Sequence, residues 1–160
     1  MGRVFRLGDN IDTDQLAPGQ YMRGGIEALA AHCLEAIHLD FADSVRPGDV
    51  IVAGRNFGAG SSREQAAEAL KHLGLTAVIA HSFAGIFYRN AINLGLPALV
   101  VPDASGISDG DVCTLDLDAG TLTVEGREVA LEPIPENLQV LLADGGLVPH
   151  LKKRFAEART

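Results

Sequence analysis

Short apolar runs alternate with amphipathic segments over the first two thirds of the chain, a pattern typical of strands that alternate with helices. The apolar runs predict four buried strands, at about residues 4–7, 49–53, 76–80 and 99–101. Apolar residues that recur every three or four positions predict three helices, over residues 25–37, 61–73 and 84–94. This order predicts an α/β fold with helices packed against a sheet.

The last third of the chain has a different pattern. Residues 111–132 alternate apolar and polar positions and are broken by Ala-Gly and Glu-Gly turns, which predicts an antiparallel meander and therefore a mixed sheet. Two helices are expected after it, at 136–143 and 147–157. The basic run Lys152, Lys153 and Arg154 is expected to complement the C-terminal end of the last helix, with a partner contact as the alternative.

Composition narrows the classes of partner. The chain has 160 residues and a net charge of −8, which fits one domain over 1–160 and argues against nucleic acid as the main ligand. No apolar run reaches the roughly 18–20 residues of a membrane span, and the first residues do not have the form of a signal peptide. The two cysteines, Cys33 and Cys113, are too few for an iron–sulfur cluster, and we expect buried thiols in a reducing cytoplasm.

The strongest candidate for chemistry is a glycine-rich loop, residues 54–60, followed by Ser61, Ser62 and Arg63. It lies between a predicted strand and a predicted helix, where the helix N-terminus and a bidentate arginine favour a small anion. The loop lacks the Gly-Lys-Ser/Thr ending of a phosphate-binding loop. A structural alternative remains, because Ser61-x-x-Glu64 also fits a capping box.

A second polar segment contains Asp12, Thr13 and Asp14. Two carboxylates two residues apart could orient a catalytic group, but their spacing alone favours the capping of a turn. Arg23 lies among glycines in a loop that could close on an anion, although an isolated arginine of this kind is usually a surface residue. The five histidines do not show the i, i+4 spacing of a helical metal pair, so we expect surface or core roles for them.

These motifs occur together and in a specific order. GDNIDTDQLAPGQYMRG at 8–24, RPGDVIVAGRNFGAGSSREQAAEAL at 46–70 and HSFAGIFYRNAINLGLPAL at 81–99 resemble the small subunits of isopropylmalate dehydratases, which are similar to the swivel domain of aconitases. The resemblance spans nearly the whole chain and implies a swivelling β/β/α domain. Gly85 is a departure, because many relatives carry an arginine at this position.

The resemblance also implies roles for individual residues. Ser61 would be the base that abstracts a proton, and Asp14 would match an active-site aspartate. Ser62 and Arg63 would bind a substrate carboxylate, and Arg23 would match a second substrate arginine. A large subunit would hold a [4Fe-4S] cluster, and the pair would form a heterodimer or heterotetramer acting on a small dicarboxylate.

The implied reaction is the isomerisation of 2- and 3-isopropylmalate through 2-isopropylmaleate, a step of leucine biosynthesis. The 21–24 loop is associated with substrate choice in this family: Met22 could meet an isopropyl group, whereas Arg23 could favour an additional carboxylate. Homoaconitase and dimethylmalate or citraconate hydratases therefore remain alternatives. A stand-alone module that binds small anions is an alternative from another class.

Overall fold

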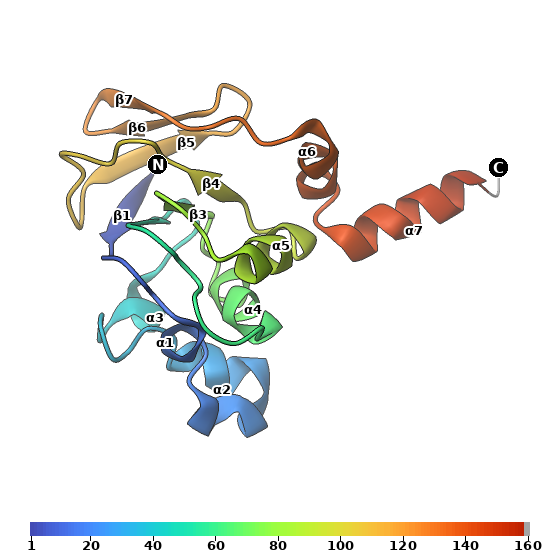
Figure 1. Ribbon diagram of the computed structural model, residues 1–160, viewed down its shortest axis with the longest axis horizontal. Helices are drawn as coiled ribbons and strands as arrows, with labels where there is room; N and C mark the ends of the chain where they lie inside the picture. The colour runs from blue at the N-terminus through green and yellow to red at the C-terminus, as the bar shows by residue number, and fades with distance from the viewer. Residues whose placement is uncertain (159–160) are drawn as a thin grey trace.

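A computed structural model of the chain describes residues 1–158. Within these residues, seven strands form one mixed sheet in the order β4-β3-β2-β1-β5-β6-β7 (Figure 1). Strands β1 to β4 are parallel, and β5 to β7 form an antiparallel meander attached to β1. The strands are β1 (Gly2–Arg6), β2 (Val50–Ala53), β3 (Ala77–Ala80), β4 (Ala98–Val100), β5 (Val112–Asp116), β6 (Thr121–Val124) and β7 (Arg127–Ala130).

Helices occupy the connections between the parallel strands and the end of the chain. The short η1 (Gly19–Gly24) is a 3-10 helix, and the others are α-helices. These are α1 (Thr13–Leu16), α2 (Gly25–Ala31), α3 (Phe41–Ser44), α4 (Glu64–His72), α5 (Gly85–Asn93), α6 (Glu136–Ala143) and α7 (Leu147–Ala158). Figure 1 shows α7 extending away from the rest of the molecule. Among residues 1–158, no helix is long and apolar enough to cross a membrane.

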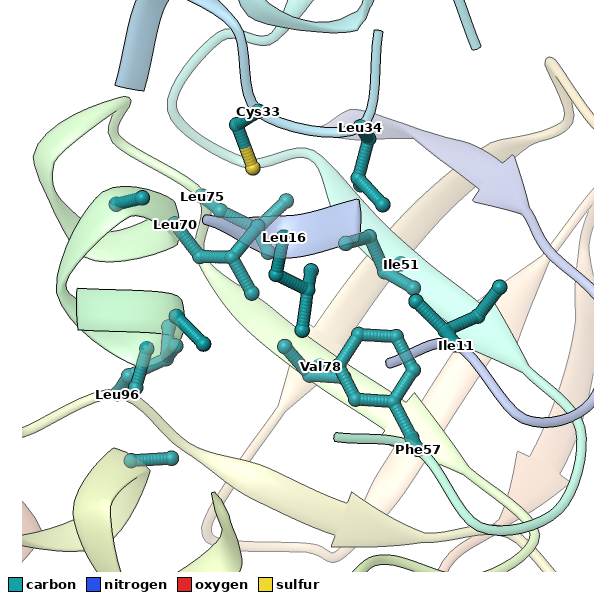
Figure 2. Close-up of a cluster of buried hydrophobic side chains, with 14 of the residues drawn as sticks. Ile11, Leu16, Cys33, Leu34, Ile51, Phe57, Leu70, Leu75, Val78 and Leu96 are labelled. Carbon is teal, nitrogen blue, oxygen red and sulfur yellow. The ribbon is translucent and has the colours of Figure 1, made fainter. Parts of the chain in front are cut away.

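The two faces of the sheet bury two separate cores because successive residues of a strand point to opposite sides. Ile51 and Val78 face the helices and pack with residues such as Leu70 and Phe57 in what we call the helix-side core (Figure 2). Val50 and Val52 face the other side and pack with apolar residues of the meander in the meander core. The sheet is curled, since the N–H of Glu132 after β7 donates to the Val100 carbonyl of β4 at 2.8 Å. The predicted mixed α/β sheet with flanking helices is confirmed.

The predicted helix over 25–37 is wrong in its second half. Helix α2 ends at Ala31, and turns follow it although the apolar spacing continues. Leu34 has a positive φ of 60°, and its N–H donates to the Gln15 carbonyl at 2.9 Å. A tertiary hydrogen bond therefore replaces the helical one, and Leu34 remains fully buried without helical geometry.

The C-terminal helices are close to their expected bounds, with α6 at the expected 136–143 and α7 ending one residue later than expected. The expectation for the basic run is wrong in detail. Lys152, Lys153 and Arg154 lie in the middle of α7, and its last turn contains no basic residue. Lys153 instead contacts Asp144 before the start of the helix.

Candidate active site

Three loops that follow parallel strands meet at one edge of the sheet. The loop after β2 lies against the segment after β1: the Asn10 N–H donates to the Arg55 carbonyl at 2.8 Å, and the Gly58 N–H to the Ile11 carbonyl at 2.7 Å. The loop after β3 joins it, since the Phe57 N–H donates to the Ser82 carbonyl at 3.0 Å. Carboxyl ends of parallel strands commonly carry ligand sites, so this edge is the expected place for one.

Gly58 is required where the loop passes over α5. Its φ is +85°, and a Cβ built on it would lie 2.3 Å from Cβ of Phe87. A side chain here would therefore meet both left-handed backbone strain and a packed aromatic residue.

We expect Gly58→Ala to lower the free energy of unfolding by about 2–5 kcal/mol, combining the two penalties. The matched control is Gly8→Ala, because a Cβ at Gly8 meets nothing within 4 Å. Urea denaturation of both variants measures the difference. Equal stability of the two variants would show that the loop can move away from α5.

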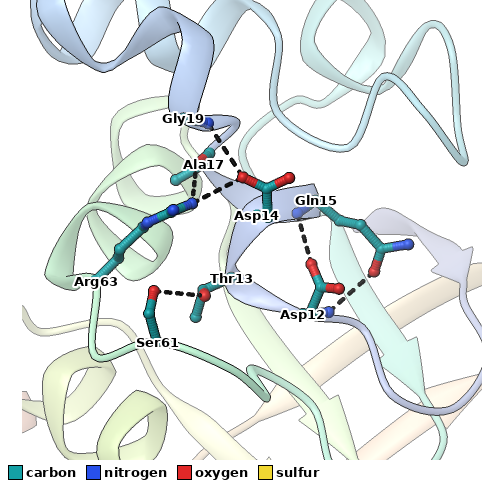
Figure 3. Close-up of polar contacts among 8 residues, drawn as sticks. All are labelled: Asp12, Thr13, Asp14, Gln15, Ala17, Gly19, Ser61 and Arg63. Carbon is teal, nitrogen blue, oxygen red and sulfur yellow. Dashed lines mark hydrogen bonds and ion pairs between the residues drawn. The ribbon is translucent and has the colours of Figure 1, made fainter.

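Ser61 is held by the first residue of α1. Its hydroxyl oxygen lies 3.2 Å from the Thr13 hydroxyl, and Thr13 is buried (Figure 3). The helix start is fixed by a capping box in which the Asp12 carboxylate accepts from the Gln15 N–H and the Gln15 side chain accepts from the Asp12 N–H. Ser61 itself is exposed, so a buried neighbour orients the hydroxyl of a serine that a ligand can reach.

The Ser61-x-x-Glu64 capping box considered from the sequence does not form. Helix α4 begins at Glu64, and its N-cap Arg63 makes no side-chain capping bond. Its predicted start at 61 was therefore three residues too early. The serine hydroxyl pairs with α1 instead of the first turn of α4. The capping interpretation is confirmed for the other segment, where Asp12 caps α1.

Arg63 and Asp14 form an ion pair beside this serine. Nη1 of Arg63 lies 2.9 Å from Oδ1 of Asp14 and also donates to the Ala17 carbonyl at 3.1 Å (Figure 3). The Gly19 N–H donates to the same Asp14 oxygen at 3.2 Å. Hydrogen bonds from the Arg63 guanidinium and from Gly19 hold the pKa of the Asp14 carboxyl below its usual value.

This pairing has a consequence for ligand binding. An aspartate is ionised at neutral pH, and the lowered pKa of Asp14 keeps it ionised in more acidic solution as well, so its charge compensates Arg63 in the free chain. Within residues 1–158, the Arg63 side chain donates its hydrogen bonds through Nη1 alone. The other nitrogens of the guanidinium are therefore available to bind a ligand. Asp14 thus acts chemically as an orienting partner for Arg63.

Arg23 is not bonded to this group. It is exposed in the last turn of η1, and among the described residues no hydrogen bond or ion pair joins it to Ser61, Ser62 or Arg63. The helix η1 is nevertheless tied to the cluster, because it begins at Gly19 beside Asp14. Of the site residues expected from the sequence, the structure therefore brings together Asp14, Ser61 and Arg63. Ser62 is exposed and follows Ser61 in the chain, and Arg23 is on the neighbouring helix η1.

Sequence reasoning missed two supports of these residues. Thr13 was noted as part of a polar segment, but its pairing with Ser61 joins positions 48 residues apart and has no local signal. The stack of Tyr21 on His32, with 3.5 Å between ring centroids, also anchors η1 to the end of α2. Met22 is half-buried and packs against the helix-side core.

The two cysteines do not meet. Cys33 is buried in the helix-side core and Cys113 in the meander core, and both are free thiols. Burial raises the pKa of the Cys33 thiol, and burial together with the Asp49 charge raises that of Cys113 to about 11. Within residues 1–158, no three His, Cys, Asp or Glu side chains gather as a metal site.

Comparisons with known proteins show the family of the chain. Residues 31–104 match the aconitase C-terminal domain. The chain is 51% identical over 156 residues to the methanogen homoaconitase small subunit of Methanothermobacter thermautotrophicus, which covers 95% of this chain and 90% of the relative. It is 49% identical over 156 residues to 3-isopropylmalate dehydratase small subunit 1 of Thermotoga maritima, covering 95% of this chain and 94% of the relative.

A third relative has another substrate in its name. The 2,3-dimethylmalate dehydratase small subunit of Eubacterium barkeri is 47% identical over 154 residues, covering 94% of each chain. A crystal structure of 3-isopropylmalate dehydratase (leuD) from Methanocaldococcus jannaschii superposes with a TM-score of 0.93 at 45% identity, covering 99% of this chain and 96% of that one. The chain therefore belongs to the aconitase C-terminal domain family that includes the small subunits of 3-isopropylmalate dehydratase.

Proposed function

We propose that this chain is the small subunit of a hydro-lyase that isomerises 2-isopropylmalate and 3-isopropylmalate through 2-isopropylmaleate, as in leucine biosynthesis. The observation that carries the proposal is the juxtaposition of Ser61 and Arg63, each oriented by a residue of the segment after β1. Relatives named as 3-isopropylmalate dehydratase small subunits support the substrate.

Within this proposal, Ser61 takes the proton from the carbon next to a substrate carboxylate. A serine hydroxyl is a weak base, so it needs hydrogen-bond donors and positive charge to stabilise the alkoxide. The Thr13 hydroxyl can donate to it, and Arg63 follows two residues later. Ser62 and Arg63 bind the substrate carboxylate, and Asp14 keeps the guanidinium in position.

The site needs a second protein surface to complete it. Ser61, Ser62 and Asp14 are exposed, whereas proton abstraction from carbon is favoured where water is excluded. A large subunit that holds a [4Fe-4S] cluster would cover this edge, and the cluster would supply Lewis-acid chemistry at the leaving hydroxyl. We assign the complex to a reducing cytoplasm, where Cys33 and Cys113 remain thiols.

Anaerobic coexpression with a candidate large subunit tests the proposal. We expect the two chains to copurify and to convert 2-isopropylmalate into 3-isopropylmalate, with neither chain active alone. A panel that adds homoaconitate, citraconate and 2,3-dimethylmalate compares the alternatives. A chain that binds small dicarboxylates but no large subunit would instead support the stand-alone module and contradict the enzyme proposal.

Arg23 favours homoaconitate as the second candidate substrate. The side chain is exposed on η1, and a guanidinium suits an additional carboxylate better than an isopropyl group. Small subunits named as methanogen homoaconitases are 51% and 47% identical to this chain.

We expect Arg23→Met to lower kcat/KM for homoaconitate by about 10- to 100-fold, because it removes one charge-assisted hydrogen bond. The same variant should change kcat/KM for 3-isopropylmalate by less than about threefold, since that substrate offers no third carboxylate to Arg23. Arg89→Met is a matched control at an exposed position on α5. An equal loss with both substrates would place Arg23 on a carboxylate that they share.

A further inference from the structure

Helix α7 carries a stripe of exposed apolar side chains on one face. Val148, Leu151 and Phe155 are 60%, 40% and 65% exposed. Their i, i+3, i+7 spacing places them on one face of the helix, which extends away from the rest of the molecule (Figure 1). A continuous apolar face of this kind is typical of a protein–protein contact.

The outward direction of α7 is fixed by polar contacts at its base. The Asp144 carboxylate lies 2.7 Å from Nδ1 of His150 and 3.2 Å from Nζ of Lys153. The bend before the helix is packed as well, because a Cβ built on Gly146 would lie 2.4 Å from the Asn93 carbonyl oxygen. These contacts fix the base of the helix against its own chain, and the apolar stripe beyond the base stays exposed and available to another molecule.

A groove of about 750 Å³ lies on the other side of α6. It is bounded by β4, the turn between β5 and β6, the segment after β7, and α6 itself. Its apolar lining includes the buried Leu99 and Leu131. Four exposed carboxylates also line it: Asp116, Asp118, Glu132 and Glu136.

The helix and the groove are complementary in charge and polarity. At about 100° per residue, Lys152 and Arg154 flank the apolar stripe of α7 on its two sides, and Lys153 points to the opposite face, where it contacts Asp144. In a chain with a net charge of −8, this run of three cations is a local exception. An apolar helix face flanked by cations suits an apolar groove that carries four carboxylates.

We propose that α7 of one copy of this chain binds in the α6 groove of a second copy, and that the exchange is reciprocal about a twofold axis. Every copy carries both complementary parts, so a twofold arrangement buries both helices and leaves no open contact. The 12-residue helix is about 18 Å long, enough to lie along such a groove. None of the residues that line the groove belongs to the Ser61 loop, so the dimer leaves the candidate active site free. With one large subunit on each copy, the assembly would be a heterotetramer.

A charge exchange tests this pairing directly. In one variant, Lys152→Glu and Arg154→Glu reverse the charge beside the helix stripe. In a second, the charge of the groove is reversed by Asp116→Lys, Asp118→Lys, Glu132→Lys and Glu136→Lys. Each variant alone places like charges at both contacts, so we expect its dimer dissociation constant to rise at least about tenfold. Mixing the two variants restores opposite charges at both contacts, and we expect a mixed dimer.

Sedimentation equilibrium of the small subunit alone measures these states, with circular dichroism to confirm folding. Wild type should be dimeric, and so should the control Arg89→Glu, at an exposed position of α5. The double variant with Leu151→Glu and Phe155→Glu should be monomeric. A monomeric wild type, a dimer that survives the Leu151 and Phe155 substitutions, or no mixed dimer from the two charge variants would overturn the proposal. Protection of α7 from hydrogen exchange only when the large subunit is present would assign the helix to that partner instead.

Discussion

Replacing Ser61 with alanine is expected to lower the turnover of the reconstituted pair by about 10²- to 10⁴-fold, the range that a positioned proton-transfer group contributes. The substitution removes the oxygen that accepts the proton and leaves the buried Thr13 hydroxyl without its 3.2 Å partner. Since Ser61 is exposed and does not cap α4, the fold should be unaffected. Initial rates with the pair and thermal unfolding of the small subunit measure the two effects.

Ser44→Ala serves as the matched control, because this serine is exposed on α3 and lies outside the 54–63 segment. Both variants should copurify with the large subunit as wild type does. If the complex with the Ser61→Ala small subunit turns over within about twofold of wild type, this serine is not the base. A variant that no longer binds the large subunit would show a role in assembly in place of catalysis.

Replacing Arg63 with lysine is expected to give the second largest effect. One guanidinium nitrogen donates to both the Asp14 carboxylate and the Ala17 carbonyl, and the remaining nitrogens can bind substrate. The ammonium of a lysine has a single nitrogen, which would have to serve Asp14, Ala17 and the substrate together. We expect kcat/KM to fall by about 10- to 100-fold, mainly through KM, because a charge-assisted bidentate contact is lost. Steady-state kinetics on 2-isopropylmalate measures the two parameters separately.

The Asp14→Asn variant separates the charge that Arg63 offers to substrate from the orientation of its guanidinium. It leaves the positive charge of Arg63 in place but removes the carboxylate that aligns it, so its effect should be smaller than that of Arg63→Lys. Arg55→Lys is a control for an arginine of the same loop, since the Arg55 backbone N–H, and not its side chain, makes the hydrogen bond to Asp9. Unchanged kcat and KM in Arg63→Lys would remove Arg63 from the substrate site.

Local patterns predicted the fold wherever local interactions decide the structure. Apolar spacing and the glycines at 145–146 placed α6 and α7, and the apolar runs placed the parallel strands within one or two residues. The same spacing failed at Leu34, where a hydrogen bond to Gln15 overrides the helical pattern. The start of α4 was misplaced for a similar reason, because Ser61 pairs with Thr13 across the sheet edge.

The candidate site was likewise predictable in part from the sequence. Its residue types and their order were visible in the sequence, and the family resemblance supplied roles for Ser61, Ser62 and Arg63. The pairing of Arg63 with Asp14 joins positions 49 residues apart, and no local spacing indicates it. The orientation of these side chains follows from how the loops after β1 and β2 bond to each other, which only the folded chain shows.

The central claim is that Ser61 transfers the proton between solvent and the substrate carbon. Hydration of 2-isopropylmaleate in D₂O by the reconstituted pair tests it most directly, with mass spectrometry of the recovered hydroxy acid. The account predicts one carbon-bound deuterium per turnover with wild type, and a rate of incorporation about 10²- to 10⁴-fold lower with Ser61→Ala. Incorporation at the wild-type rate in the alanine variant would contradict the account, because another group would then be carrying the proton.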